Sequence, residues 1–317
     1  MKTNMIYQGK AFNVLKQFPD QSINTCVTSP PYWGHRDYNV EGQLGLENTP
    51  EEYVERLVGI FAEVKRVLKD DGTLWLNLGD SYAGSGGYHA EHHKNDTGFQ
   101  AERNTEKGAG VTGTKSTGNL KPKDLVGIPW RVAFALQDDG WYLRNDIIWH
   151  KPNPMPESVT DRCTTSHEHI FLLSKSKQYY YDQDAIKEPS NEAGKTISLG
   201  DKSFSKGQSE GMNREPTGNA KNDTYEVKDK RNKRDVWKLP TQPFSDAHFA
   251  VYPPDLIRPC VKAGCPEDGV VLDPFFGAGT TGLVAKELSR NYVGIELNED
   301  YIEMAQDRIK EVQKELL

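Results

Sequence analysis

The sequence predicts an α/β protein built on an open, mostly parallel sheet. Segments that read as strands and as helices alternate along the chain, and this alternation is typical of parallel strands joined by helical crossovers. One segment, residues 270–282 (VVLDPFFGAGTTG), combines a strand, a glycine-rich loop and the start of a helix. The 317 residues are enough for one large domain or two modest ones.

The N-terminal part of the chain predicts three short strands and one long helix. Residues 51–69 (EEYVERLVGIFAEVKRVLK) place apolar side chains at helical spacing, with Asn48 or Thr49 as a cap and Pro50 in the first turn. The strands are expected at 4–8, 23–28 and 73–78, with a helical turn at 11–18 and a tight turn at Asp71-Gly72.

Two polar segments interrupt the middle of the chain. Residues 84–123 are rich in Gly, Thr, Lys and His, and this length without apolar residues predicts a mobile functional loop. Residues 187–235 form the second polar segment. Between them we expect a helix at about 124–138 and strands at about 142–149 and 168–174.

From residue 251 onward the pattern is helix, strand, helix, strand, helix. The glycines of the loop fit GxGxxG, and the strand that follows ends in Glu296. Such a loop brings backbone N–H groups close to a ligand, and an acidic residue about 20 positions further on can bind ribose hydroxyls. An NAD-dependent dehydrogenase would explain these features, although a plain tight turn would explain the glycines equally well.

Asp273, at the end of the strand before the loop, favours a different ligand. A carboxylate at this position would repel a pyrophosphate, whereas it suits a cation. S-adenosylmethionine has ribose hydroxyls and a positive centre but no phosphate, so it fits this stretch better than a dinucleotide.

A second motif follows the strand at 23–28. Residues 28–33 (TSPPYW) place two prolines between a serine and a tyrosine. Prolines fix the backbone and lack an N–H, so their carbonyl groups are held in place. In isolation this motif is more typical of a turn that ends a strand.

Together the two motifs resemble a known family. TSPPYW at 28–33 and DPFFGAGTT at 273–281 resemble the catalytic and cofactor motifs of bacterial and phage DNA amino-methyltransferases. Their order, with the catalytic motif first, is similar to the beta class. The resemblance extends to RNDIIW at 144–149, HEHIFLLSKSKQYYYD at 167–182, RDVW at 234–237 and HFAVYPPDLI at 248–257.

The resemblance implies a seven-stranded, Rossmann-like class I S-adenosylmethionine-dependent methyltransferase sheet. The sheet would be circularly permuted and would carry polar insertions for DNA recognition. Residues 1–183 would form the catalytic half, with the mobile loop at 84–123. Residues 184–240 would form the target-recognition region, and residues 241–317 the cofactor-binding half.

The resemblance also implies how the site works. The target is an exocyclic amino group, whose lone pair is delocalised into the base. The Ser29 side chain and the Pro30 carbonyl would accept its N–H groups, Pro31 would add rigidity, and Tyr32 would stack on the flipped base. Methyl transfer would then be direct and in line, without a covalent enzyme intermediate. The residues expected to hold S-adenosylmethionine are Asp273, Phe275, Gly277, Gly279, Thr280 and Glu296, with His248 and Ala250 from the preceding motif.

The expected substrate is double-stranded DNA. In this family a serine at the first motif position goes mostly with cytosine N4 and an aspartate with adenine N6, so cytosine N4 is favoured and adenine N6 is the alternative. The net charge of −7 argues weakly against nucleic acid, but the distribution of charge matters more. The candidates for phosphate contacts are Lys115, Lys121 and Lys123, and the basic stretch with Lys228, Lys230, Arg231, Lys233 and Arg234.

Other classes fit less well. Methyltransferases of RNA or of protein glutamine also use a Pro-Pro-Tyr motif, but their cofactor motif comes first. A non-catalytic DNA-binding module would not need an intact Ser29 to Tyr32 motif. Pro259-Cys260 resembles a pair found in cytosine C5 methyltransferases, yet it falls on an expected helix, so we interpret Cys260 as a core residue.

The remaining sequence features predict a cytoplasmic protein, and the resemblance implies that a bacterium, an archaeon or a phage encodes it. The chain contains no apolar run long enough to span a membrane and no apolar signal core. The cysteines form no CxxC pair, and we interpret His89, His92 and His93 as surface residues, so no metal is expected. The class is compatible with a cognate restriction endonuclease as partner and with a homodimer. Lys10 and Asn24 stand where the family often has aspartates.

Overall fold

The chain divides into a large unit and a small unit. In the computed structural model, the large unit comprises Met1–Asp182 and Asp235–Leu317, and the small unit comprises Gln183–Arg234. The structure describes residues 1–35, 40–83, 120–191, 193–198, 224–242 and 251–315. Most of the expected mobile loop at 84–123 lies outside these residues. The expected recognition region at 184–240 overlaps the small unit, but its last residues belong to the large one.

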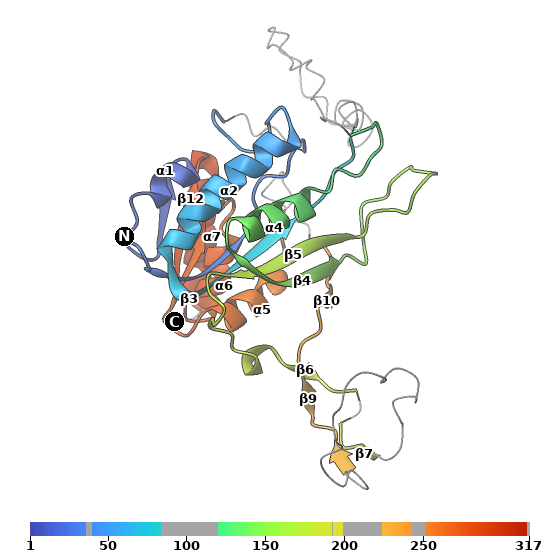
Figure 1. Ribbon diagram of the computed structural model, residues 1–317. Helices are drawn as coiled ribbons and strands as arrows, with labels where there is room; N and C mark the ends of the chain where they lie inside the picture. Colours follow the sequence, from blue (N-terminus) through green and yellow to red (C-terminus); the bar gives the residue numbers. More distant parts are fainter. Residues whose placement is uncertain (36–39, 84–119, 192, 199–223, 243–250, 316–317) are drawn as a thin grey trace, which may run out of the picture. The chain divides into compact units, whose positions relative to one another are not determined.

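One sheet forms the centre of the large unit (Figure 1). All neighbouring strands are parallel except β5, which runs antiparallel to both of its neighbours. The sheet is therefore mostly parallel, as predicted. Among the described residues it has eight strands rather than the seven expected. Their order is β1 (Met5–Gln8), β12 (Asn291–Glu296), β11 (Val270–Asp273), β2 (Ile23–Thr28), β3 (Leu68–Leu78), β5 (His167–Ser174), β4 (Tyr142–His150) and β10 (Val236–Lys238).

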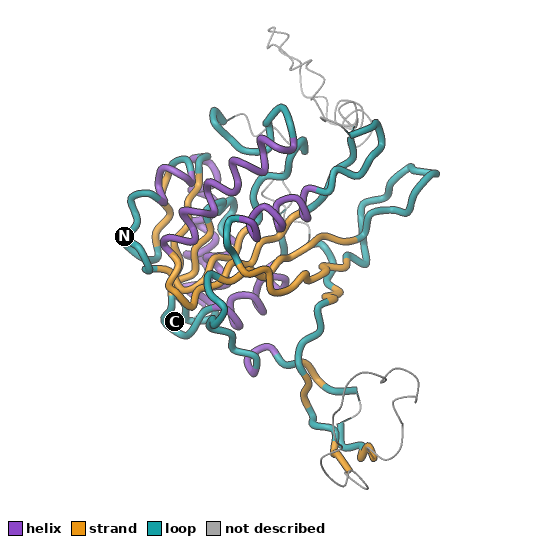
Figure 2. Tube along the Cα trace, viewed as in Figure 1, coloured by secondary structure: helices purple, strands orange, loops and turns teal. Residues whose placement is uncertain are grey.

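Two layers of helices cover the sheet, as the tube view in Figure 2 shows. Within the first group α2 contacts both α1 and α4, and within the second group α6 contacts both α5 and α7. In the part of the chain that the structure describes, no helix has the length and apolar character needed to cross a membrane. The first group is α1 (Ala11–Leu15), α2 (Pro50–Val67) and α4 (Ile128–Asp138), and the second is α5 (Pro254–Gly264), α6 (Thr280–Glu287) and α7 (Glu299–Glu315).

The long helix α2 forms where the sequence predicts it. The Thr49 side chain accepts a hydrogen bond from the Glu52 backbone N–H at 3.1 Å, which caps the helix. The helix ends two residues earlier than expected, because Leu68 already belongs to β3. The expected turn at Asp71-Gly72 lies inside β3, where the pairing with β2 shifts its register.

The helix α4 begins four residues later than predicted, and a carboxylate explains its start. Asp80 follows β3 and accepts hydrogen bonds from the backbone N–H groups of Gly127 and Ile128 at 2.9 and 3.0 Å. These N–H groups have no partner inside the helix, so a carboxylate at this end stabilises it. Such a cap cannot be read from the local sequence, since Asp80 lies about 47 residues away.

The pairing of the neighbouring strands β2 and β11 places the candidate site. Their register pairs Cys26 with Leu272. Because the strands are parallel, Ser29 and Pro274 leave the sheet at the same edge. The Asn24 side chain fixes this register, since its Oδ1 accepts the backbone N–H of Val270 at 3.0 Å.

The described residues of the small unit form two antiparallel strand pairs and a short 3₁₀ helix. Strand β6 (Glu188–Pro189) pairs with β9 (Lys230–Arg231), and β7 (Thr196–Ser198) pairs with β8 (Thr224–Glu226). The 3₁₀ helix η2 covers Asp184–Ile186. The first pair brings residues about 42 positions apart into register.

The Phe276 ring packs closely against β12 beneath the glycine loop, and a substitution in this strand can test that packing. A Cβ atom added to Gly294 in β12 would lie 2.5 Å from this ring. We therefore expect Gly294→Ala to lower the free energy of unfolding by about 1–3 kcal/mol. Gly59→Ala in α2 is the control, because nothing lies within 4 Å of its added Cβ. We expect the control to raise stability by about 0.5–1 kcal/mol. Urea unfolding measures both changes, and an unchanged midpoint for Gly294→Ala would contradict the packing.

Candidate active site

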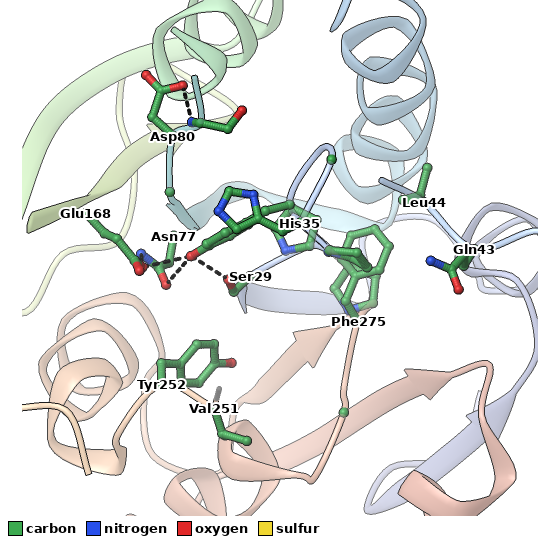
Figure 3. Close-up of a pocket in the computed structure, with 18 of the residues that line it drawn as sticks. Ser29, His35, Gln43, Leu44, Asn77, Asp80, Glu168, Val251, Tyr252 and Phe275 are labelled. Atoms are coloured by element: carbon green, nitrogen blue, oxygen red, sulfur yellow. Dashed lines mark hydrogen bonds between the residues drawn. The ribbon is translucent and has the colours of Figure 1, made fainter. Parts of the chain in front are cut away.

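A cavity of about 1560 Å³ opens at the carboxyl edge of the parallel strands. Ligands of open α/β sheets bind at this edge, where the strand order reverses. Figure 3 shows that side chains from several separate segments point into this space. The predicted site residues that line it are Ser29, Pro30, Pro31, Tyr32, Phe275, Gly277, Thr280 and Glu296.

The TSPPYW segment at 28–33 (the transfer motif) leaves β2 along a fixed path. Ser29 follows the last residue of the strand, and Pro30 is buried. The Tyr53 hydroxyl in α2 donates to the Pro31 carbonyl at 2.9 Å. The two proline rings and this hydrogen bond hold the segment rigidly against the helix, so the groups at Ser29 and Pro30 do not need to be ordered by a ligand.

The Tyr32 side chain is held through both its ring and its hydroxyl. A Cβ added to Gly79 would lie 2.6 Å from the ring, so only a glycine leaves room for it there. The Tyr32 hydroxyl donates to Oε2 of Glu168 at 2.8 Å and lies 3.3 Å from the Ser29 hydroxyl. Burial, and then the nearby Glu168 carboxylate, raise the pKa of Tyr32 well above its usual value. Tyr32 therefore remains a protonated hydrogen-bond donor at neutral pH.

Glu168 joins the ends of β3, β4 and β5. It accepts from Nδ2 of Asn77 at 3.1 Å and forms an ion pair with Lys151. The two side chains of the pair are only 15% and 19% exposed. A charge pair this buried is costly unless further hydrogen bonds satisfy it, and the bonds from Asn77 and Tyr32 do so. Ser29, Asn77 and Glu168 converge in Figure 3.

Asn77, Lys151 and Glu168 were not predicted from the sequence as site residues. Glu168 lies within the stretch at 167–182 that carries the family resemblance, but we gave it no role there. A polar side chain at the end of each strand beside the transfer motif is the signal that could have found all three. Their meeting depends on the antiparallel orientation of β5, which has no local signature in the sequence.

The glycine loop presents Gly277 to the cavity. Gly277 has a positive φ of 49°, and a Cβ added there would meet open space. Its backbone N–H donates to Oε2 of Glu296 at 2.7 Å. The other carboxylate oxygen, Oε1, accepts the N–H groups of Leu297 and Asn298 at 2.8 and 2.9 Å. Oε2 thus keeps a lone pair for a further donor, so the site fits a ligand with ribose hydroxyls.

The other two glycines of the loop serve packing. Gly279 has a φ of 79°, and its Cβ would lie 2.7 Å from Ala305 in α7. A Cβ on Gly282 would lie 2.6 Å from the Phe276 ring. In GxGxxG loops the last glycine commonly permits such close helix packing. Packing alone therefore explains why position 279 is a glycine, and Gly279 does not line the cavity. Its predicted contact with the cofactor stays a prediction.

Asp273 lies beneath the loop and does not line the cavity. Its Oδ1 accepts from the Thr28 hydroxyl at 2.6 Å and from the Phe275 N–H at 3.0 Å. Its Oδ2 accepts from the Thr281 hydroxyl at 2.6 Å and from the Tyr252 hydroxyl at 3.0 Å. Four protein donors occupy a carboxylate that we expected to attract a cationic ligand. Asp273 therefore holds the loop and the strand end together, and its contact with the cofactor stays a prediction.

Several predicted residues fall elsewhere. His248 and Ala250 lie outside the described residues, as do the three histidines of the segment at 84–119 and Lys115. Lys10 lines the cavity. Cys260 is fully buried in α5, in agreement with its interpretation as a core residue.

The predicted basic stretch belongs to the small unit. Glu188 accepts from Nε of Arg231 at 2.9 Å and from Nε of Arg234 at 2.6 Å. These two arginines therefore stabilise the β6–β9 pair. Lys228 and Lys230 are exposed beside them.

A family model described as DNA methylase matches residues 23–307. The chain belongs to this family. It is a DNA methyltransferase of the N4/N6 group, so the predicted recognition is confirmed and the dehydrogenase alternative is set aside.

Two relatives of this DNA methylase match almost the whole chain. The Type II methyltransferase M.XycI of Xanthomonas campestris pv. cyanopsidis is 47% identical over 98% of this chain and 89% of its own length. The Type II methyltransferase M.SmaI of Serratia marcescens is 46% identical over 98% of this chain and 91% of its own.

Solved structures confirm the fold of the DNA methylase as a class I methyltransferase sheet. The PvuII DNA methyltransferase (cytosine-N4-specific) has a TM-score of 0.63 at 17% identity, covering 99% of this chain and 91% of its own. A protein of Thermus thermophilus complexed with S-adenosyl-L-methionine has a TM-score of 0.58 at 22% identity, covering 97% and 93%.

The burial of Glu296 predicts how stability depends on pH. Desolvation raises its pKa above the usual 4.5, against the opposing hydrogen bonds from the backbone. Because the folded pKa lies above the unfolded one, the wild type loses stability as pH rises from the unfolded pKa to the folded pKa. Glu296→Gln carries no titrating group, so its free energy of unfolding should lack this fall. Denaturant unfolding across this pH range tests the difference, and parallel curves for the two proteins would refute it.

Proposed function

We propose that this DNA methyltransferase moves a methyl group from S-adenosylmethionine to N4 of a cytosine flipped out of double-stranded DNA. One observation carries the proposal: Ser29 and the Gly277 loop line the same cavity at the ends of neighbouring parallel strands. A base and a methyl donor bound there would be side by side.

The cofactor half of the cavity suits S-adenosylmethionine. When bound, S-adenosylmethionine supplies an electrophilic methyl group on a positively charged sulfur. Glu296 would accept from the ribose hydroxyls, and the Gly277 backbone lets the ligand approach closely. Phe275 adds an aromatic face that favours a cation. The T. thermophilus structure, with S-adenosyl-L-methionine, supports this assignment.

Ser29 and Pro30 would prepare the amino group. Their oxygen atoms accept its two N–H groups and draw the nitrogen out of conjugation with the ring, so that its lone pair can attack. The N–C bond forms as the C–S bond breaks, and the methylated nitrogen then releases one proton. The hydrogen bonds from Tyr32 and Asn77 to Glu168 keep the wall beside Ser29 rigid, which preserves the alignment of these acceptors.

Cytosine is favoured over adenine for two reasons. Ser29 offers a neutral hydroxyl, where the adenine enzymes of this family mostly carry an aspartate. The PvuII neighbour is described as cytosine-N4-specific, and its fold covers 99% of this chain. Adenine N6 stays as the alternative target, because the two amino groups have the same geometry.

The decisive experiment is the identification of the methylated nucleoside. The protein is incubated with labelled S-adenosylmethionine and unmethylated genomic DNA, and the digested nucleosides are analysed by mass spectrometry. Labelled N4-methylcytosine is the expected product. N6-methyladenine would refute the target base but keep the mechanism, and an absence of labelled nucleoside would refute the proposed function.

Ser29 gives the sharpest mutational test. Ser29→Ala removes one preorganised acceptor, so turnover should fall by roughly 100-fold or more, as for other such groups. Affinity for S-adenosylmethionine, measured by calorimetry, should remain unchanged. Ser22→Ala, whose hydroxyl bonds the Pro19 carbonyl outside the cavity, is the control and should keep full activity. A Ser29→Ala protein with the wild-type rate would rule out the acceptor role.

We also propose that the basic stretch of the small unit binds the DNA backbone. Arg231 and Arg234 shape the segment through Glu188, and the exposed Lys228 and Lys230 would contact phosphates. Lys228→Ala and Lys230→Ala should each weaken binding to all sequences and reduce the slope of log affinity against log salt by about 1. Fluorescence anisotropy at several salt concentrations measures this slope. Lys310→Ala on α7 is the control, and equal slopes in all proteins would exclude the contacts.

A further inference from the structure

The connection between β4 and β5 carries an apolar side chain that the fold does not use. Met155 is 83% exposed, and among the described residues no other large apolar side chain exceeds 59%. Leaving this side chain in water forgoes the stabilisation that burying an apolar side chain would give. Pro154 and Pro156 flank it, and proline restricts both its own backbone and that of the residue before it. Met155 is therefore presented to solvent by a stiff segment.

Hydrogen bonds fix the root of this connection. The Lys151 N–H donates to the Ser166 carbonyl at 2.8 Å, which continues the pairing of β4 with β5. Asn153 and Thr241 exchange two hydrogen bonds, from Asn153 Nδ2 to the Thr241 carbonyl at 3.2 Å and from the Thr241 N–H to Asn153 Oδ1 at 3.0 Å.

Ion pairs fix the returning side of the connection and balance its charge. Arg162 binds Glu157 at 2.6 Å, and its guanidinium lies 4.0 Å from the centre of the Tyr82 ring. Asp161 pairs with Lys123 at 2.6 Å. Both acidic side chains of this segment therefore have a cation beside them, which reduces their repulsion of a phosphate backbone.

The same segment lies at the rim of the cavity. Pro154, Met155 and Val159 line it together with Ser29, and Lys151 at its root pairs with Glu168. In Figure 1 the connection extends well beyond the ends of β4 and β5. An exposed apolar tip thus stands beside the site where the target base is proposed to enter.

We propose that Met155 is a wedge that enters the DNA duplex at the place the target base leaves. This inference rests on the proposed function. Extruding a base costs free energy, because its stacking and pairing are lost. Proteins that deform DNA commonly insert apolar side chains, methionine among them, between base steps to offset such costs. The unbranched, flexible methionine side chain can adapt to the neighbouring bases on either side of the gap.

The test first maps on genomic DNA the sequence that the enzyme methylates. It then compares two synthetic duplexes that contain this sequence. One is fully paired, and the other has an abasic site opposite the target base, so that no base pair needs to open. Met155→Ala should slow single-turnover methylation about tenfold on the paired duplex and leave it close to wild type on the abasic one. Met155→Leu, which keeps an apolar side chain of similar volume, should restore the rate on the paired duplex. Val236→Ala, a 59% exposed residue on β10 away from the cavity, is the control.

A binding measurement separates this inference from the proposed function. 2-Aminopurine placed at the target position becomes fluorescent when it leaves the stack, and this signal requires no methyl transfer. The wild type should raise the fluorescence, and Met155→Ala should raise it much less. An equal rate loss on both duplexes, or wild-type behaviour of Met155→Ala in both assays, would overturn the wedge. A wild type that binds and flips the base but never methylates it would instead overturn the proposed function and leave the wedge supported.

Discussion

The buried carboxylate of Asp273 joins the two halves of the active site. Thr28, at the end of β2, donates to one of its oxygens at 2.6 Å, across 245 positions of sequence. Thr281 at the start of α6 and Tyr252 donate to the other oxygen. One side chain therefore fixes the strand that leads into the transfer motif, the glycine loop and the helix behind that loop. In the proposed function, the relative position of the amino group and the methyl donor depends on this contact.

A buried carboxylate is stable only when hydrogen-bond donors satisfy its oxygens, and each oxygen of Asp273 accepts from two donors. Burial raises the pKa of Asp273, while the hydrogen bonds from Thr28, Thr281, Phe275 and Tyr252 act in the opposite direction. At two other strand ends Glu296 and Glu168 are likewise held by hydrogen bonds, and both side chains line the cavity. Glu296 keeps a lone pair for a ligand, whereas Glu168 is held by Lys151, Asn77 and Tyr32. Three carboxylates at one edge of the sheet thus serve the scaffold, the proposed cofactor site and the proposed base site.

Local patterns in the sequence predicted much of the fold and part of the site. The helical spacing around Tyr53 and Leu57 gave α2, and the strand before Gly277 gave β11, because both signals lie within about ten residues. The motif at 28–33 pointed to Ser29 and Tyr32 for the same reason. The ion pair of Lys151 with Glu168 was missed, since it requires β4 and β5 to pair. The structural role of Asp273 was not predicted, because its donor Thr28 comes from a distant strand and strand order is not encoded locally.

Proline restricts the backbone at two places where the large unit is proposed to contact its substrate. At Pro30 and Pro31 it fixes polar acceptors at the base of the cavity, and around Met155 it fixes an apolar tip at the rim. A flexible loop at either place would have to lose about 1–2 kcal/mol of conformational free energy per ordered residue when DNA binds. Proline restricts the unfolded chain as well, so part of this ordering is already complete in the free protein. The binding energy of DNA can then be used to extrude the base rather than to order the protein that receives it.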